Sequence, residues 1–420
     1  ISPKHEAHYY ELHIDTRNNK PEIIKDNTIK WKKDHGTRIE LDLEGSYQKG
    51  DQSADQYLKQ TAIVNPHVTL IYTNPKSEQV IFARASAEMP RKPVEIKPHP
   101  YGVEMGIMMN MLKATETRSL QSFLTNEFSR VGSGTAKQIC QNAKLLPGAG
   151  PKSLSREDVE KLINGIKQTK IIAPPVDCIS PITEELLEKG LKKEINAEFY
   201  TAVTRPPSVY RGNPFVVEVG IAYGGEQLAD NTIKLFRYAN RVPLQYQQSG
   251  CAVTKSVINT AWRNYGLSQS RGALPIGPVT VAVHIASVWV PFTSESKEAL
   301  AHYPEIVKEI KLALQECGRK LGSYIGKKRR VHFESKKRDY IKMFIPHVGE
   351  ALQELLGFKK DEEKKVEELL AVILEDTRGK IEQVEAVNTE YDEEFAKIGK
   401  EEKKEEQTTL EEKDNGKEKA

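Results

Sequence analysis

Cysteine is scarce in this sequence, with four residues in a chain of 420. The four lie far apart, and no two are spaced as in a CxxC motif. This spacing argues against a zinc site and against a disulfide framework, so we expect buried free thiols. The cysteines are Cys140, Cys178, Cys251 and Cys317.

Long apolar runs and charge of one sign are also missing. No run reaches the length of about eighteen apolar residues that a membrane helix needs, and no signal peptide is visible, so we expect a soluble intracellular protein without membrane contact. Lys and Arg together number 62 and Asp and Glu 59, which gives a formal net charge of +3. This balance excludes a uniformly basic nucleic-acid coat but leaves room for local basic patches.

Glycine-rich phosphate loops are absent too, since neither GxxxxGK[ST] nor GxGxxG occurs. The chain by itself is therefore not expected to bind a nucleotide. It also starts at Ile1 inside an alternating pattern, so we expect a piece of a longer protein.

The length is enough for two or three domains. Residues 1–95 are expected to be the end of an α/β domain, made mostly of strands and turns. The patterns there are a strand at Tyr9–Ile14, a turn at Asn18-Asn19, a strand at Thr37–Leu43, a helix at Ala54–Ala62 and a hairpin of Val68–Tyr72 with Gln79–Arg84.

Residues 96–173, after a proline-rich boundary, are predicted to form a compact helical module. Ser155 and Asp158 look like a capping box at the start of one helix. The turn at Gly132–Thr135, close to Lys137, is either a plain connection between helices or a phosphate site built from backbone N–H groups. An apolar stripe marks another helix: Leu120, Phe123, Leu124, Phe128 and Val131.

Residues 174–345 return to strands, at Phe215–Ala222, Thr232–Tyr238 and Val279–Val290. A helix at Val253–Trp262 lies between the last two, which indicates a βαβ unit that should be right-handed. Arginines fall in the turns or edges of this layer. The sequence leaves open whether three of them, Arg205, Arg211 and Arg241, face a partner or form internal ion pairs.

Lys297 follows a polar turn, Thr293–Ser296, between an apolar strand and the mouth of a long amphipathic helix. It is either a solvated lysine in a helix's first turn or a cation placed to meet an anion. The helix continues into a basic span, 327–338, that either contacts a phosphate backbone or an acidic partner, or is a solvated face. Two further short helices are expected at Ile345–Leu356 and Val366–Leu374, and residues 399–420 should be disordered.

Four segments together resemble the B subunit of archaeal DNA topoisomerase VI, a type IIB topoisomerase. The resemblance runs from residue 1 to about 356 in the family's own order. It implies an α+β multidomain fold: the end of a GHKL-type ATPase α/β sandwich at 1–95, an all-α helix–two-turns–helix domain at 96–173, a right-handed βαβ transducer domain with a long basic C-terminal helix at 174–345, C-terminal helices at 346–398 and the tail at 399–420. The segments are HPYGVEMGIMMNMLKATETRSLQSFL (99–124), TRPPSVYRGNPFVVEVGIAYGG (204–225), RYANRVPL (237–244) and VPFTSESKEALA (290–301).

The resemblance also implies site residues. Lys297 matches the family's transducer lysine, which reaches the γ-phosphate of ATP, and Thr37 is similar to a threonine near the adenine. Trp262, Arg263 and Tyr265 resemble the family's Trp-Lys-x-Tyr loop, which approaches DNA, with Arg in place of Lys. Further DNA contacts are expected in the basic helix, at Lys327, Lys328, Arg329 and Arg330. No catalytic residue and no metal ligand is expected in this chain.

The resemblance finally implies partners and an activity. ATP with Mg²⁺ would be bound mainly by a segment upstream of this chain, whose motifs are absent. Two B subunits and two A subunits would form a heterotetramer that relaxes and decatenates double-stranded DNA by ATP-dependent strand passage in a prokaryotic cytoplasm. The A subunit would hold the cleaving tyrosine. Two alternatives are a DNA- and partner-binding fragment without a working nucleotide pocket, and an ATP-independent scaffold related to meiotic-recombination partners.

Overall fold

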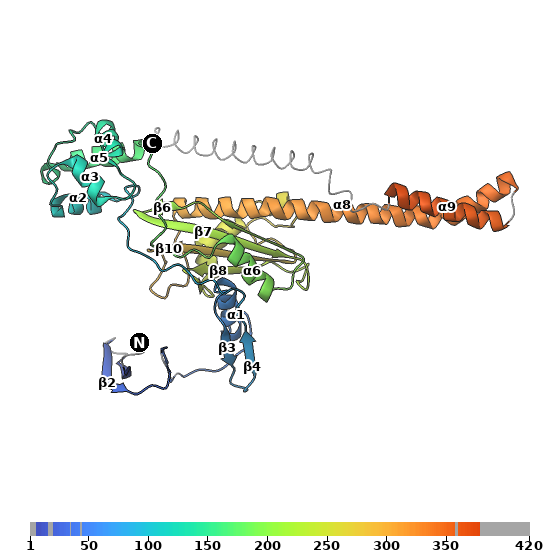
Figure 1. The fold of residues 1–420 in the computed structure, drawn as a ribbon, viewed down its shortest axis with the longest axis horizontal. Coiled ribbons are helices and arrows are strands. Elements are labelled where there is room, and N and C mark those ends of the chain that lie inside the picture. Colours follow the sequence, from blue (N-terminus) through green and yellow to red (C-terminus); the bar gives the residue numbers. More distant parts are fainter. Residues whose placement is uncertain (1–5, 16–19, 34, 43, 358–359, 379–420) are drawn as a thin grey trace. The chain divides into compact units, whose positions relative to one another are not determined.

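The computed structural model describes residues 6–15, 20–33, 35–42, 44–357 and 360–378 (Figure 1). The chain divides into two compact units, a first one up to Gln48 and a second one from Lys49 onwards. Helices and strands both contribute to the fold, which confirms the predicted mixed α and β class. None of the helices in the described ranges is long and apolar enough to cross a membrane.

The first unit contains an antiparallel ribbon of β1 (Ala7–Asp15) and β2 (Lys20–Ile29). β1 confirms the first predicted strand, whereas the Asn18-Asn19 turn lies outside the described residues. The strand expected at Thr37–Leu43 is wrong over its described part, which is irregular and leaves the side chains of Ile39 and Leu41 77% and 71% exposed. Alternation alone cannot make a strand, because its backbone groups need a neighbouring strand, and none of the described residues supplies one.

The second unit opens with α1 (Ala54–Val64), which Ser53 caps through a bond from the Gln56 N–H. β3 (Leu70–Thr73) and β4 (Gln79–Phe82) then form the predicted antiparallel hairpin. α1 packs on α6 (Glu184–Glu194) at a very close approach, because a Cβ on Gly190 would lie 2.0 Å from the Ile63 carbonyl oxygen. Only glycine allows the two helix backbones to meet there.

A helical module follows, with its own apolar core around Phe123 and Phe128, whose rings meet edge to face at 5.7 Å. Ser155 and Asp158 form the predicted capping box. Gly132 caps the helix that follows it, so the Gly132–Thr135 segment starts one helix and does not end another. The elements are α2 (Met105–Ala114), α3 (Leu120–Glu127), α4 (Ser133–Asn142), η1 (Pro151–Ser153) and α5 (Arg156–Gln168).

The largest sheet has the strand order β5-β7-β10-β8-β9, with β6 paired to β7. Its central strand β10 is buried along its whole length, antiparallel to β7 and parallel to β8. α7 (Ala252–Ile258) lies between β8 and β10 in the chain, which confirms the predicted strand–helix–strand unit. The strands are β5 (Phe199–Thr204), β6 (Ser208–Tyr210), β7 (Asn213–Tyr223), β8 (Lys234–Ala239), β9 (Val242–Pro243) and β10 (Val279–Ser287).

Helices cover both faces of this sheet, α6 on one face and α8 (Pro304–Leu356) on the other (Figure 1). Val281 and Val283 of β10 join the core under α8, and Ala282 between them joins the core under α6. Such a two-sided burial is typical of a central strand that reads as a continuous apolar run. β10 is therefore a fixed support for the segment 288–303, which connects it to α8.

α8 is longer than the sequence predicts, with 53 residues that begin at Pro304. The short helix expected at Ile345–Leu356 is therefore wrong as a separate element, and the border predicted at 345/346 falls inside α8. The helix continues through Pro346, and α9 (Lys360–Arg378) runs back along it, with Glu367 close to Gly349 and Glu375 paired with Arg338. α9 contains the predicted Val366–Leu374 helix, and residues 379–420 lie outside the described part.

Candidate nucleic-acid interface and lysine turn

The Trp262–Tyr265 segment forms a 3-10 turn, η3, and not the end of a longer helix. The Trp262 side chain is fully buried, and its indole N–H donates to the Val257 carbonyl at 2.8 Å. Tyr265 is 1% exposed, and its ring lies 2.5 Å from the place that a Cβ on Gly318 of α8 would take. Both rings are core residues, and the Tyr265 ring packs on α8.

Arg263 is the member of this turn that faces outward. Its Nε–H donates to the Gln269 carbonyl at 2.7 Å, and the rest of the guanidinium stays exposed. Asn264 beside it is exposed too. The positive charge of Arg263 therefore lies on the surface, while the buried rings of Trp262 and Tyr265 hold the turn against the core.

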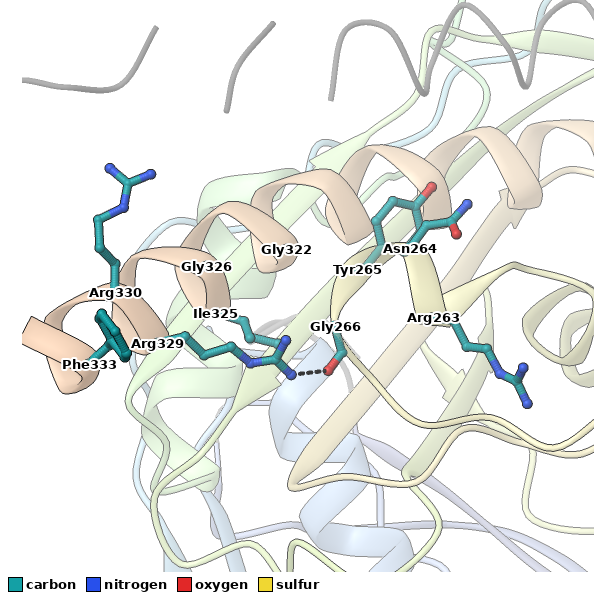
Figure 2. A pocket seen from close by; sticks show the side chains of 10 residues that line it. All are labelled: Arg263, Asn264, Tyr265, Gly266, Gly322, Ile325, Gly326, Arg329, Arg330 and Phe333. Atoms are coloured by element: carbon teal, nitrogen blue, oxygen red, sulfur yellow. Dashed lines mark hydrogen bonds between the residues drawn. The ribbon is translucent and has the colours of Figure 1, made fainter. Parts of the chain in front are cut away.

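A pocket of about 420 Å³ lies between this turn and α8 (Figure 2). Figure 2 shows Arg329 reaching across to the Gly266 carbonyl, a bond of 3.1 Å, while Arg263 and Arg330 point outward. Arg329 is thus the guanidinium that crosses the pocket, and Arg263 and Arg330 carry positive charge on the surface on either side of it, a charge that suits phosphate oxygens. The lining residues are Arg263, Asn264, Tyr265, Gly266, Gly322, Ile325, Gly326, Arg329, Arg330 and Phe333.

The lysines of the basic span do not line this pocket. Lys328 forms an ion pair with Glu198 and lies over the Tyr223 ring at 5.9 Å. The hydrogen bond that Lys328 donates to Glu198 raises the pKa of Lys328 and lowers the pKa of Glu198. Lys327 is exposed and has no partner within the described ranges. Arg263, Arg329 and Arg330 therefore line one pocket, with the side chains of Arg263 and Arg330 directed outward, and Lys327 and Lys328 are not part of its lining.

Sequence reasoning missed the floor and the aromatic wall of the pocket. Gly322 and Gly326 of α8 lie in its lining, and Gly318 one turn earlier receives the Tyr265 ring. Glycine at every fourth position of a helix leaves one face without side chains. That spacing, followed by Phe333, was the signal in the sequence that could have revealed a hollow here.

Lys297 lies on a closed turn, and not in the first turn of a helix, since α8 begins seven residues later at Pro304. Its backbone is left-handed, with a φ of +56°, and its N–H donates to the Ser294 carbonyl at 3.2 Å. Two more backbone bonds close the loop, from Thr293 to Ala299 and from Ala301 to Pro291. The side chain is exposed, and no group in the described part of the chain is paired with its ammonium.

Three arginines that the sequence left open make internal contacts. Arg205 pairs with Glu309 at 3.2 Å and Glu316 at 3.3 Å. Arg211 pairs with Glu104 at 2.8 Å, and its guanidinium also lies 5.5–5.7 Å from three aromatic ring centres. Arg241 donates to three backbone carbonyls. These groups are committed to the fold.

Thr37 lies in the first unit, exposed and in an irregular segment. The four cysteines are unpaired, three of them buried and Cys178 half-buried, in agreement with the predicted free thiols.

The amino-acid sequence is similar to those of one family of known proteins. A family model described as "Topoisomerase VI B subunit, transducer" matches residues 174–338. The B subunit of type 2 DNA topoisomerase 6 from Methanococcoides burtonii is 48% identical over 357 residues, which are 85% of this chain and 57% of the relative. The corresponding protein from Natronomonas pharaonis is 30% identical, with 83% of this chain and 67% of the relative covered. The chain belongs to the topoisomerase VI B subunit family.

The chain matches only part of the length of its relatives. The chain spans 57% of the length of the Methanococcoides burtonii relative and the same share of the relative from Archaeoglobus fulgidus, which is 42% identical over 82% of this chain. Among solved structures, the B subunit of DNA gyrase from Myxococcus xanthus aligns at 20% identity over 29% of this chain and 38% of its own, with a TM-score of 0.20. That likeness is too weak to support any argument.

Proposed function

We propose that this chain is the clamp and transducer part of a topoisomerase VI B subunit, which acts with an A subunit to relax and decatenate DNA by ATP-dependent double-strand passage. The observation that carries the proposal is the Lys297 turn. An exposed ammonium stands on a backbone loop closed by three hydrogen bonds, in the segment that connects β10, the most buried strand of the sheet, to α8. Such a cation is placed to gain from an anion brought by another segment.

The anion would be the γ-phosphate of ATP. The described residues do not fit a nucleotide and metal site by themselves: they contain no cluster of three or more His, Cys, Asp or Glu side chains, and the sequence has no glycine-rich phosphate loop. ATP with Mg²⁺ would therefore be held mainly by residues outside this chain. Lys297 would supply one charged contact, and Thr37 would lie on the adenine side.

Lys297→Ala, in a B subunit that includes the nucleotide-binding segment and is paired with its A subunit, tests the proposal. We expect DNA-stimulated ATP turnover to fall by about a hundredfold or more, the scale set by losing a charged contact to a transferring phosphoryl group. Lys297→Arg should also lose activity, because a planar fork does not replace a point charge. Lys234→Ala, an exposed lysine on β8, is the matched control.

Full turnover with Lys297→Ala would contradict the proposal. The purified chain alone is the second control and should neither hydrolyse ATP nor cut DNA. Nicking by the purified chain would show that the cleaving tyrosine is here and not in the A subunit.

DNA contact is proposed at the pocket between η3 and α8, through Arg263, Arg329 and Arg330, with Lys327 beside it. These cations would bind phosphates without reading base sequence. The double variant Arg263→Gln, Arg329→Gln should weaken binding to duplex DNA equally for all base sequences. It should also reduce the slope of log affinity against log salt concentration by about one to two. Lys189→Gln, an exposed lysine on α6, is the control, and an unchanged slope in the double variant would place the DNA elsewhere.

The finer architecture belongs to the same proposal. Residues 1–95 would be the end of a GHKL-type ATPase domain, 96–173 a helix–two-turns–helix domain and 174–345 the transducer. The A subunit would dock on the distal part of α8 and on α9, where Phe344, Val348 and Leu355 of α8 are exposed apolar side chains. Two B subunits would close on ATP to form a heterotetramer with two A subunits on double-stranded DNA in the cytoplasm.

A second candidate function is a DNA- and partner-binding scaffold, because the described residues do not form a nucleotide site by themselves. Without the upstream segment, the pocket and the α8–α9 hairpin would still serve as a DNA- and partner-binding scaffold. The two functions differ in the Lys297→Ala experiment: a scaffold loses nothing, since its binding does not use that lysine.

A further inference from the structure

The turn between β8 and β9 is unusual in its backbone. Asn240 and Arg241 are both left-handed, with φ of +47° and +65°. A two-residue hairpin turn needs positive φ at both positions, and its second position normally holds glycine. An arginine there carries backbone strain, which persists only when surrounding contacts hold the residue in place.

The Arg241 side chain supplies such contacts on one side of the turn. Its guanidinium donates to the carbonyls of Val64 at 3.0 Å, Ser180 at 3.3 Å and Pro181 at 2.8 Å. Its own carbonyl accepts a bond from the Asn65 side chain at 3.3 Å. Val64 and Asn65 are the last residue and the cap of α1, so Arg241 fastens the end of α1 to the sheet.

The Arg241 backbone is fixed by a buried pair. Its N–H donates to His284 Nε2 at 2.9 Å, so the other ring nitrogen, Nδ1, carries the hydrogen and donates to Glu218 at 2.7 Å. Glu218 also accepts the N–H groups of Ile182 and Thr183, next to the carbonyls that Arg241 binds. These hydrogen bonds connect the Arg241 backbone through His284 and Glu218 to the 180–183 segment, and such a network restrains the turn from moving alone.

Asn240 supplies the contacts on the other side. Its N–H donates to the Ile285 carbonyl at 2.9 Å, and its side chain exchanges two bonds with the Ser287 backbone, at 2.9 and 3.0 Å. The Ser287 hydroxyl in turn donates to the Pro214 carbonyl and accepts from the Trp289 N–H. Asn240 therefore fixes the point where β10 ends and the segment 288–297 begins.

We propose that the Asn240–Arg241 turn is a positioning element that joins the C-terminal end of α1 to the end of β10 and so fixes the segment carrying Lys297. Adjacent residues of one tight turn cannot move independently, so a shift of α1 against the sheet pulls on the Asn240–Ser287 bonds. The importance of Lys297 rests on the proposed function, but the mechanical link does not.

Hydrogen–deuterium exchange of the whole chain tests this link. Arg241→Lys keeps the cation but cannot hold three carbonyls at once, because an ammonium lacks the planar fork. We expect amide exchange to rise about tenfold or more at the end of α1 and also over 287–297, the factor that one lost buried hydrogen bond implies. Exchange in the middle of β7 should not change.

Two further variants sharpen the result. Asn240→Asp keeps an acceptor for the Ser287 N–H but loses the donor to its carbonyl, so exchange should rise over 287–297 alone. Arg205→Lys is the matched control, because Arg205 ties the sheet to α8 through Glu309 and Glu316 and has no contact with the turn.

Faster exchange at α1 without any change over 287–297 in Arg241→Lys would overturn the proposal, as would an equal effect of Arg205→Lys on that segment. Should Arg241→Lys fail to fold, Asn240→Asp decides alone, and unchanged exchange over 287–297 refutes the link. The readout needs neither nucleotide nor DNA, so it stays separate from the ATP turnover test of Lys297.

Discussion

Residues of one short motif can have opposite roles. In Trp262–Tyr265, the aromatic side chains fill the core, and the arginine between them lies at the edge of the pocket and points outward. The close fit of Tyr265 on Gly318 sets how near η3 comes to α8, and this approach determines the width of the pocket. The proposed DNA contact of Arg263 therefore depends on packing that involves no charge.

Gly318→Ala tests that packing. A Cβ there would lie 2.5 Å from two Tyr265 ring atoms, in a helix that cannot yield. We expect the free energy of unfolding to fall by about 1–3 kcal/mol, the usual cost of overpacking, measured by denaturant titration. Gly134→Ala is the control, since a Cβ at that helical position meets nothing within 4 Å. Equal effects of the two changes would show that the Tyr265 contact is unimportant.

Among the elements, α8 connects the largest sheet to α9. Its first half packs on the sheet through Ile310, Leu314 and Leu321, and its second half packs on α9 through Ile345 and Gly349. Between them lies the basic span that reaches the pocket. One continuous helix therefore carries the transducer core, the proposed DNA contacts and the proposed docking surface.

Pro346→Ala tests whether that continuity is under strain. Proline removes one helix hydrogen bond and costs about 3 kcal/mol in a helix interior. Pro346 is exposed, so alanine should slow amide exchange around position 346 and raise the thermal stability of the α8–α9 hairpin. Ala351→Gly on the same helix should do the reverse, by about 1 kcal/mol. A loss of stability in Pro346→Ala would mean that the hairpin requires the proline.

At the scale of the whole molecule, a buried charge controls how acid affects stability. Burial opposes ionisation of Glu218, but the hydrogen bonds that it accepts from His284 and from the N–H groups of Ile182 and Thr183 outweigh it, and the pKa of Glu218 is lowered. A lowered pKa in the folded state adds stability above the ordinary glutamate pKa, and this stability is lost as the pH falls through the folded value.

The free energy of unfolding should therefore fall as the pH drops below about 4, the ordinary range of glutamic acid. Glu218→Gln should flatten this acid limb and lower stability at pH 7 by about 1–3 kcal/mol, because a buried network loses a charged acceptor. Thermal unfolding measured from about pH 3 to about pH 7, a range that spans the ordinary pKa of glutamic acid, checks both effects. Glu226→Gln, at an exposed glutamate, is the control, and an unchanged acid limb in Glu218→Gln would contradict the assignment.

The sequence by itself determined the elements whose signals are local. β10 and the buried stripe of α8 follow from apolar spacing, and the Ser155 capping box follows from two side chains three residues apart. The family was visible for the same reason, because motifs such as VPFTSESKEALA are read along the chain. Lys297 was singled out from one turn, without any distant contact.

Tertiary structure decided everything that depends on a neighbour far along the chain. The segment at 37–42 alternates but has no strand beside it among the described residues, and α8 continues through Pro346 with α9 running back along it. Tyr265 is buried where Gly318 leaves room for its ring, and Arg205, Arg211 and Arg241 have partners inside the fold. The order of apolar and polar residues determines which secondary structure a segment prefers. Whether its side chains are buried and its backbone groups paired depends on the segment that packs against it in the folded chain.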